Sequence, residues 1–442
     1  MRKLFALGLL LASTYGFSQF TGHSGVYYLG TSNIPINTSN YANPNINGVV
    51  VRFRWGDVET SPGVFNWTYV DGEIAKATTY GKKVSLQPLG KPNWLASIGA
   101  QQYYYIEEST FSPNFGQVVS DVIPWDNIYV DRYKILLQNL SVKYSSNPVV
   151  SYINAIGGNF SRGLPDTVII DTVALTTQSF WIAYNYNADT LGLLMNQLTD
   201  YYMSLFPSTP MWCSVDYVTF QPNATGQPRN YLASIYCNYG ITNYPDRFGL
   251  FREDISVCNP NFSNISPNSH WYIMQQNSCR TGAQMLWSVQ DGPTRMNQCG
   301  ITPNTKQAVL DSAVQKGLSL GMRYMEIYGI DIQDDSLSTN IQQANSLLIA
   351  QGNSCNALGI ENNEVENGIK IYPNPTNGIF EIDFKNSIDK SEIEIFNSLG
   401  QSVFKNTFFN QTEINISTFV SGIYFVKIQN GQNVITKKIV KE

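Results

Sequence analysis

One segment decides the fold class: residues 49–88, which read VVVRFRWGDVETSPGVFNWTYVDGEIAKATTYGKKVSLQP. Its first residues predict a strand that ends at Arg54-Trp55, and Pro62-Gly63 predicts a turn after that strand. Asp71 lies where a helix is expected to begin, and GKKVSL opens the next strand. A strand, a helix and a second strand in this order are typical of a parallel β-α-β unit.

The same alternation of apolar strands and amphipathic helices continues across residues 19–352. Strands are predicted at residues 25–30, 48–55, 83–89, 149–158, 211–218, 248–254, 283–289 and 322–330. Eight strands with interposed helices are what a (β/α)8 barrel requires. We therefore expect an α/β fold: a (β/α)8 TIM-like barrel followed by a small C-terminal antiparallel β-sandwich.

The C-terminal part of the chain has a different pattern. Residues 353–368 are polar and Asn-rich and are predicted to form a linker. Residues 369–442 contain short alternating runs separated by Asn-Gly, Leu-Gly and Ser-Gly turns. Such runs are typical of a small antiparallel β-sandwich.

This segment also resembles the C-terminal sorting domain of the type IX secretion system of Bacteroidetes-type bacteria. The matching motifs occur in order: Tyr372-Pro373-Asn374-Pro375, Asn377-Gly378, Ile395-Phe396-Asn397 to Gly400, Ser421-Gly422-Ile423-Tyr424 and Lys437-Lys438. The resemblance implies that the type IX secretion machinery is a partner and carries the chain across the outer membrane. The alternative is an ordinary accessory or sugar-binding β-sandwich.

The N-terminus, MRKLFALGLLLASTYGFSQF, predicts a secretory signal peptide over residues 1–18. It has a basic pair, an apolar run from Leu4 to Ala12 that is too short to span a bilayer, and small residues at Gly16 and Ser18. A buried first helix is the alternative. No later stretch is long and apolar enough for a membrane-spanning segment, so we expect a secreted or cell-surface protein.

The composition excludes several function classes. Only 14% of the residues are charged and no Lys/Arg cluster follows any segment, so nucleic acid is not an expected partner. Six cysteines in an exported chain favour disulfides, one of them holding the loop over residues 258–299, although the pairing stays open. The two histidines, His23 and His270, lie far apart and no CxxC occurs, so we expect no metal site, no cofactor and no His-activated nucleophile.

Residues 49–88, together with KPNWLA at residues 91–96, resemble part of the barrel of β-galactosidase-like retaining glycoside hydrolases. The resemblance implies an Asn-Glu pair carrying the acid/base after the fourth strand and a nucleophilic glutamate at the end of the seventh. This sequence departs from the family at both places. Phe160 follows Asn159, and Ser288 and Gln290 stand where the second glutamate is expected.

Substrate contacts are predicted from side chains near the C-terminal ends of strands, where barrel sites form. Flat aromatic rings stack on sugars, and charged groups bind sugar hydroxyls by strong hydrogen bonds. Arg52 and Arg54 share one face of their strand and Trp55 lies on the other, so a core position for Trp55 is equally open. The substrate-binding candidates are Arg52, Arg54, Trp55, Trp94, Asn159, Asp216 and Trp287.

Glycoside hydrolysis requires two carboxyl groups that flank the scissile bond. Among the acids at strand ends, Glu326 in RYMEIYGID has the most apolar setting, where burial is expected to raise its pKa and suit a general acid. We take Glu326 and Asp254 as the catalytic candidates, with Arg54 orienting one of them. The structural alternatives are that Glu326 pairs with an arginine such as Arg54 or Arg252, and that Asp254 pairs with Arg252.

These features predict a secreted, glycoside hydrolase-like protein that acts on extracellular polysaccharide or oligosaccharide. The alternative is a catalytically inactive barrel that binds glycan or serves as a cell-surface adhesin, and the missing glutamates favour it. A carbohydrate substrate or ligand is expected in both cases.

Overall fold

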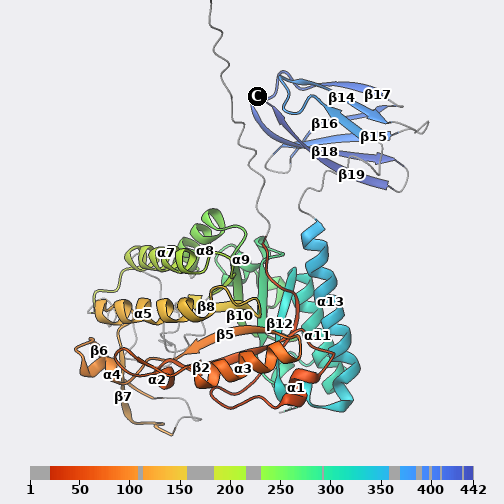
Figure 1. Cartoon of the computed structure of the whole chain (residues 1–442). Coiled ribbons are helices and arrows are strands. Elements are labelled where there is room, and N and C mark those ends of the chain that lie inside the picture. The colour runs from red at the N-terminus through yellow and green to blue at the C-terminus, as the bar shows by residue number, and fades with distance from the viewer. Residues whose placement is uncertain are drawn as a thin grey trace, which may run out of the picture. The chain divides into compact units, whose positions relative to one another are not determined.

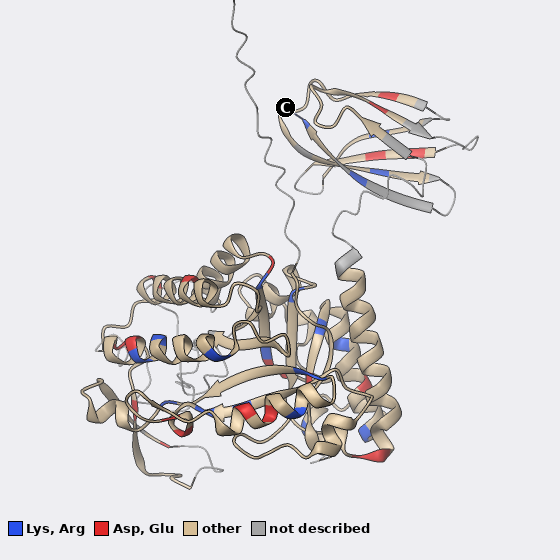
Figure 2. Cartoon of the chain, in the orientation of Figure 1, with Lys and Arg blue, Asp and Glu red and all other residues tan. Residues whose placement is uncertain are grey.

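The computed structural model describes residues 20–107, 113–156, 184–215, 230–290, 293–357, 369–384, 391–397, 401–408, 411–430 and 433–441. The predicted signal peptide lies outside these residues. The chain divides into two compact units, Met1–Gly359 and Ile360–Glu442, which are described separately (Figure 1). Charged side chains are sparse on both units, as Figure 2 shows, in agreement with the composition.

The first unit is the predicted barrel. Eight strands, each parallel to both of its neighbours, close in the order β1-β12-β11-β10-β9-β8-β5-β2. All eight correspond to predicted strands. Their bounds are β1 Gly25–Leu29, β2 Gly48–Arg54, β5 Lys83–Leu89, β8 Val150–Ile156, β9 Met211–Ser214, β10 Phe248–Ile255, β11 Thr281–Met285 and β12 Met322–Tyr328.

Helices pack around this barrel, with α3 against β2 and β5, α7 against β8, and α13 against β1 and β12 (Figure 1). Side chains of Asp126, Asn187 and Thr305 cap the N-termini of α5, α7 and α11. The helices are α1 Thr38–Ala42, α2 Trp55–Val58, α3 Thr68–Thr79, α4 Trp94–Ser97, α5 Asn127–Tyr144, α7 Ala188–Leu205, α8 Tyr231–Asn243, η2 Phe262–Asn264, α9 His270–Gln276, α10 Pro293–Met296, α11 Lys306–Ser319, α12 Gly329–Ile332, η3 Asp335–Leu337 and α13 Ser338–Ala357. Two hairpins complete the unit: β3 Glu59–Ser61 with β4 Val64–Phe65, and β6 Gln102–Ile106 with β7 Val118–Val122.

The barrel has two apolar layers because successive strand residues point to opposite faces. Phe53 and Trp55 belong to the layer between strands and helices, whereas Val50 belongs to the layer inside the barrel. The interior layer is mostly aromatic: Phe20, Tyr27, Leu29, Val50, Tyr152, Trp212, Phe251 and Tyr324. Arg52 follows Val50 by two residues, so its side chain points to the same side of the strand, toward the barrel interior.

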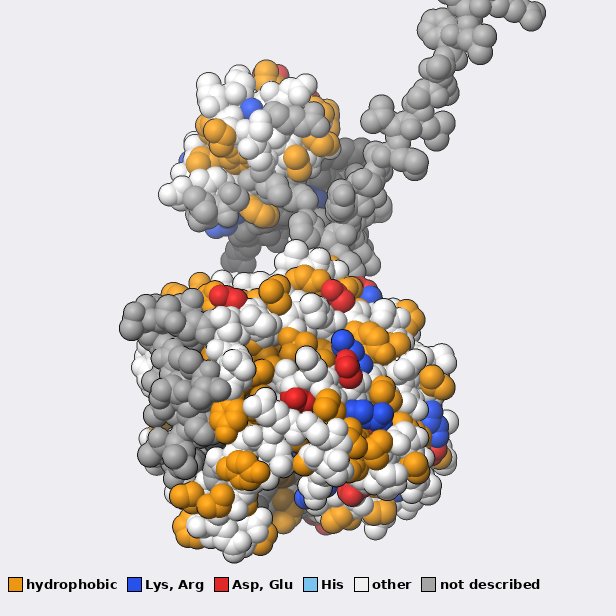
Figure 3. All heavy atoms as spheres, turned by 90° about the vertical axis from the view of Figure 1, so that its left-hand side faces the viewer, with side chains coloured by type: hydrophobic (Ala, Val, Ile, Leu, Met, Phe, Trp, Pro, Cys, Tyr) orange, Lys and Arg blue, Asp and Glu red, His pale blue; other side chains and the backbone are white. Residues whose placement is uncertain are grey.

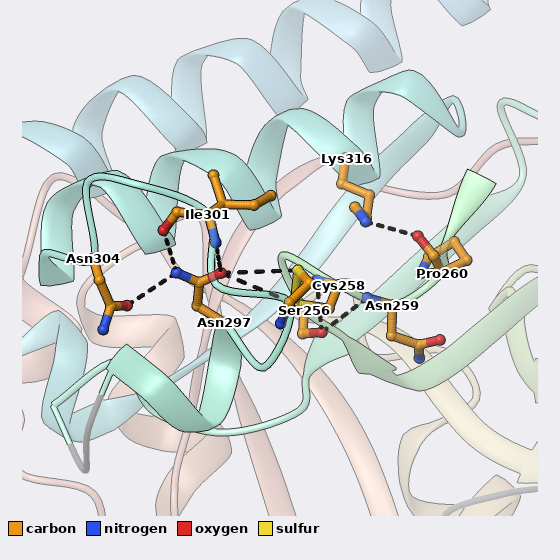
Figure 4. Close-up of a disulfide and its surroundings, with 9 residues drawn as sticks. Ser256, Cys258, Asn259, Pro260, Asn297, Ile301, Asn304 and Lys316 are labelled. Atoms are coloured by element: carbon orange, nitrogen blue, oxygen red, sulfur yellow. Dashed lines mark hydrogen bonds between the residues drawn. A yellow bond between two sulfur atoms is a disulfide. The ribbon is translucent and has the colours of Figure 1, made fainter. Parts of the chain in front are cut away.

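Two disulfides tie loops to the barrel. Cys258 and Cys299 are bonded, which confirms the predicted disulfide across that loop, and Lys316 of α11 donates to the Pro260 carbonyl at 2.7 Å (Figure 4). Asn297 braces the loop from inside, because its amide donates to the Ile301 carbonyl at 2.6 Å and its side-chain oxygen accepts from the Ile301 N–H at 2.9 Å.

The second disulfide joins Cys279, before β11, to Cys355 near the end of α13. Helix α13 runs to Ala357, so the predicted barrel boundary at residue 352 and the start of the linker at residue 353 are wrong by five residues. The reason is that residues 353–357 lack apolar periodicity and are instead held by this covalent bond. Cys213 and Cys237 are buried and take part in neither disulfide.

Replacing both Cys279 and Cys355 with serine is expected to lower the free energy of unfolding by about 2–4 kcal/mol, because the cross-link no longer restricts the unfolded chain. Urea denaturation followed by tryptophan fluorescence measures the change. The wild-type chain with reductant serves as the reference for loss of both bonds. Equal unfolding free energies for variant and oxidised wild type would contradict the expectation.

The second unit is the predicted sandwich. Its two antiparallel sheets have the strand orders β13-β14-β17 and β16-β15-β18-β19. Side chains of both sheets, among them Ile382 and Val426, form one shared core. The strands are β13 Ile369–Tyr372, β14 Ile379–Phe384, β15 Ser391–Asn397, β16 Ser402–Phe408, β17 Gln411–Asn415, β18 Gly422–Asn430 and β19 Asn433–Lys441.

Candidate functional site

A cleft of about 630 Å³ opens at the C-terminal ends of β2 and β5. Parallel strands bring all their C-terminal ends to one mouth, which is where barrel enzymes place their sites. Figure 3 views the molecule from the side on which α4 and the β6–β7 hairpin lie in Figure 1. Acidic and basic side chains lie close together near the middle of the face that the first unit shows in this view. The cleft is lined by Ser32, Arg52, Arg54, Gly56, Asp57, Thr60, Leu89, Gly90, Lys91, Pro92, Asn93 and Trp94.

Asn33 holds the rim of this cleft. Its N–H donates to the Arg52 carbonyl at 3.0 Å, and its side-chain oxygen accepts from the Arg54 N–H at 3.0 Å. Its amide also donates to the carboxylate of Asp57. Asn33 has a φ of 58°, a left-handed conformation that asparagine tolerates better than most residues. These contacts fix the backbone that carries both arginines.

Of the two positions left open for Trp55, core and sugar platform, the structure shows the core position. Its side chain is 1% exposed and packs against Trp94, Tyr129 and Tyr133. The indole N–H donates to Glu59 at 2.7 Å, and Glu59 is itself fully buried. The physical reason is strand parity, because Trp55 continues the face of β2 that packs against the helices.

Trp94, in contrast, lines the cleft and is only partly buried. Its indole N–H donates to the Glu59 carbonyl at 2.8 Å, and the guanidinium of Arg132 lies 5.2 Å from its ring centroid. Arg132 is paired with the Glu59 carboxylate. Trp94 is therefore a fixed aromatic wall of the cleft, held from behind by a buried ion pair.

Glu326 lies inside the barrel on β12, opposite Gln284 of β11, and is 0% exposed. One carboxyl oxygen accepts from the Tyr324 hydroxyl at 2.8 Å, and the other has no hydrogen-bond partner among the described residues. Burial raises the pKa of Glu326 to about 7, although the Tyr324 hydroxyl and the charge of Arg52 oppose the shift. The arginine whose charge acts on Glu326 is Arg52, not Arg54 as predicted. Arg54 lies two residues further along β2 and is exposed to solvent.

A register shift in β10 determines where its acids lie. Arg252 stands opposite Ala283 and Ile255 opposite Met285, so both Glu253 and Asp254 oppose one residue of β11. The Asp254 carboxylate accepts from two nitrogens of Arg252 at 2.9 and 2.5 Å. The structure therefore contains the ion pair that was the alternative for Asp254.

Tyr328 links the two remaining acids. Burial raises the pKa of its hydroxyl, Arg52 lowers it, and the charges of Glu253 and Glu326 both raise it further. The Tyr328 hydroxyl donates to the Leu286 carbonyl at 3.3 Å and accepts from Gln284 at 3.4 Å. The charges of two carboxyl groups therefore act on one hydroxyl, and Arg52, which lines the cleft, acts on the same hydroxyl with opposite sign.

The remaining candidates are Trp287, Asn159 and Asp216. Trp287 follows β11 and does not line the cleft, and the guanidinium of Arg295 lies 3.6 Å from its ring centroid. Asn159 and Asp216 lie outside the described residues. Lys91 lines the cleft but is occupied, since it donates to Asp121 at 2.9 Å. Among the described residues, no group of three or more His, Cys, Asp or Glu side chains is arranged to hold a metal ion.

Sequence reasoning missed a ring of polar residues in the interior. Gln87, Asn154, Ser214 and Gln284 are buried there and have side-chain atoms without a hydrogen-bond partner in the described structure. Each lies two positions after another residue that faces the interior by strand alternation. That period-2 signal could have identified them.

Comparison with known proteins identifies the tail. Residues 370–442 match the family described as the secretion system C-terminal sorting domain. This domain indicates type IX secretion and a secreted or cell-surface protein. No helix in the described part of the chain is long and apolar enough to cross a membrane.

The barrel is similar in structure to several glycoside hydrolases at low identity. They include the β-amylase catalytic domain of Paenibacillus polymyxa (11% identity, 74% of this chain and 98% of that one, TM-score 0.44). They also include a β-galactosidase of Marinomonas ef1 (10%, 76% and 62%, TM-score 0.44) and endo-glycoceramidase II of Rhodococcus sp. (10%, 95% and 97%, TM-score 0.39). At these values the likenesses carry no argument about activity. No curated protein matches the sequence.

Proposed function

We propose that this exported chain binds carbohydrate in the cleft at the mouth of its barrel and hydrolyses a glycosidic bond there. The observation that carries the proposal is the buried carboxyl of Glu326 beside Arg52, which itself lines the cleft. A carboxyl group whose pKa lies at about 7 keeps a proton to donate near neutral pH. Glu253, only partly buried, supplies the second carboxyl group.

The chemistry follows from these two groups. Glu326 gives its proton to the glycosidic oxygen as the bond from that oxygen to C1 breaks. Glu253, as a carboxylate, either activates a water molecule or attacks C1 first. In both routes the water hydroxyl ends on C1 and its proton ends on a carboxylate, so bonds and protons balance.

The second candidate function is glycan binding without hydrolysis. It is favoured by the 0% exposure of Glu326, since a general acid must reach its substrate. The two functions are separated by incubating the full-length protein with α-linked and β-linked oligosaccharides. Sugar release that depends on Glu326 supports hydrolysis, whereas binding measured by calorimetry without any release supports the second candidate.

Replacing Trp94 with alanine is expected to weaken oligosaccharide binding about tenfold, which corresponds to about 1.4 kcal/mol of lost stacking. Titration calorimetry measures the change. Trp94→Phe is the matched control, because it keeps a flat apolar face and is expected to retain most of the affinity. Equal affinity of the alanine variant and the wild type would show that the sugar does not contact this wall.

A further inference from the structure

Two arginine side chains line the cleft without a hydrogen-bond or ion-pair partner among the described residues. The guanidinium groups of Arg52 and Arg54 have no hydrogen bond or ion pair with any described residue, and Nε of Arg52 is buried. Lys91 is already paired with Asp121. One carboxylate, that of Asp57, lines the cleft beside them, and it accepts from Asn33.

Nε of Arg52 is a buried donor to which the described residues offer no acceptor, and an unpaired buried donor destabilises a structure. In a chain with only 14% charged residues, most other arginines of the barrel do have acceptors. Arg132 binds Glu59, Arg252 binds Asp254, and Arg323 donates to Ser24. A guanidinium presents paired N–H groups that match the two oxygens of a carboxylate or the oxygens of a sulfate.

We propose that the cleft recognises an anionic sugar, one that carries a carboxylate or a sulfate, through Arg54 and Arg52. The proposal rests on the proposed function of the cleft as a carbohydrate site and names its substrate class. Arg54, at the exposed rim, binds the anionic group. Arg52 lies deeper, where its charge acts on Glu326, and orients the sugar toward the interior. Trp94 supplies the stacking surface on the same wall.

The test compares charged and neutral glycans on the full-length protein. Calorimetry measures the affinity for uronic acid oligosaccharides, for the same oligosaccharides with their carboxyl groups reduced to alcohols, and for a sulfated glycan. We expect at least one charged glycan to bind about tenfold or more tightly than its neutral counterpart. The two charged arms distinguish a carboxylate ligand from a sulfate ligand.

Three variants test whether Arg54 causes the preference for charged glycans. Arg54→Gln is expected to abolish the preference for the charged glycan, and Arg54→Lys to keep only part of it, because lysine retains the charge without the paired donors. Arg54 is exposed, so neither change threatens the fold. Lys143→Gln is the charge-matched control: Lys143 lies on the last turn of α5, paired with Asp71, and its loss should leave the preference unchanged.

The outcomes separate this proposal from the one on which it rests. A preference that Arg54→Gln removes supports the anionic substrate class. Equal binding of charged and neutral glycans, unchanged in Arg54→Gln, would overturn that class and leave carbohydrate binding intact. Failure to bind any glycan of either kind would overturn both proposals.

Discussion

Glu326→Gln is expected to lower kcat for sugar release about a thousandfold, because the amide has no proton to give to the leaving oxygen. Glutamine has nearly the same shape and keeps an acceptor for the Tyr324 hydroxyl. Oligosaccharide affinity is therefore expected to remain within about twofold, since the variant loses only the proton transfer. Initial rates at saturating substrate and calorimetry on the same preparation measure the two quantities.

The same substitution is expected to change how stability depends on pH. Burial raises the pKa of Glu326 from its ordinary 4.5 to about 7 in the folded protein. Between these values the folded chain keeps a proton that the unfolded chain releases, so stability falls as the pH rises from 4.5 through 7. The full loss is about 3 kcal/mol. Glutamine does not titrate, so the variant should gain stability over the wild type across this range.

Asp131→Asn is the control for both measurements, because Asp131 is an exposed acid on α5. It should change neither kcat nor the pH dependence of unfolding. Sugar release that survives Glu326→Gln would remove Glu326 from the mechanism. A constant stability difference between variant and wild type at all pH values would show that the carboxyl does not titrate from a buried state.

The barrel was predictable because its strands are short apolar runs with clear ends. In β2, the alternation of Val49, Val51 and Phe53 with Val50 and Arg52 already contained the two layers that the structure shows. The end of α13 was not predictable in the same way. Residues 353–357 are polar, and a disulfide partner 76 residues away cannot be read from spacing.

The site was predictable only where side-chain direction follows from strand parity. That rule placed Arg52 toward the interior and Trp55 on the opposite face of the strand, where the structure buries it. It failed for β10, where the register shift sets Glu253 and Asp254 opposite a single residue. A bulge of this kind leaves no mark in the hydrophobic pattern, so the sequence favoured Asp254, whose neighbour Arg252 in fact binds it.

Glu253→Gln is therefore expected to lower kcat about a hundredfold to a thousandfold, whereas Asp254→Asn should change it less than about threefold. The two residues are adjacent, and both changes replace an acid by its amide, so they form a matched pair. The difference is expected because the Asp254 carboxylate is bound to Arg252, while Glu253 acts on Tyr328 beside Glu326. Steady-state rates on the same oligosaccharide measure both effects.

The pH profile of kcat/KM tests the assignment of Glu326 as the general acid. Glu326 as the acid gives the wild-type profile an alkaline limb near its pKa of about 7, where it loses its proton. Glu326→Gln should remove this limb from the residual activity, whereas a merely structural role would lower the rate without changing the limb. A large decrease in kcat in Asp254→Asn, together with a normal kcat in Glu253→Gln, would show that Asp254 and not Glu253 is the second catalytic carboxyl group.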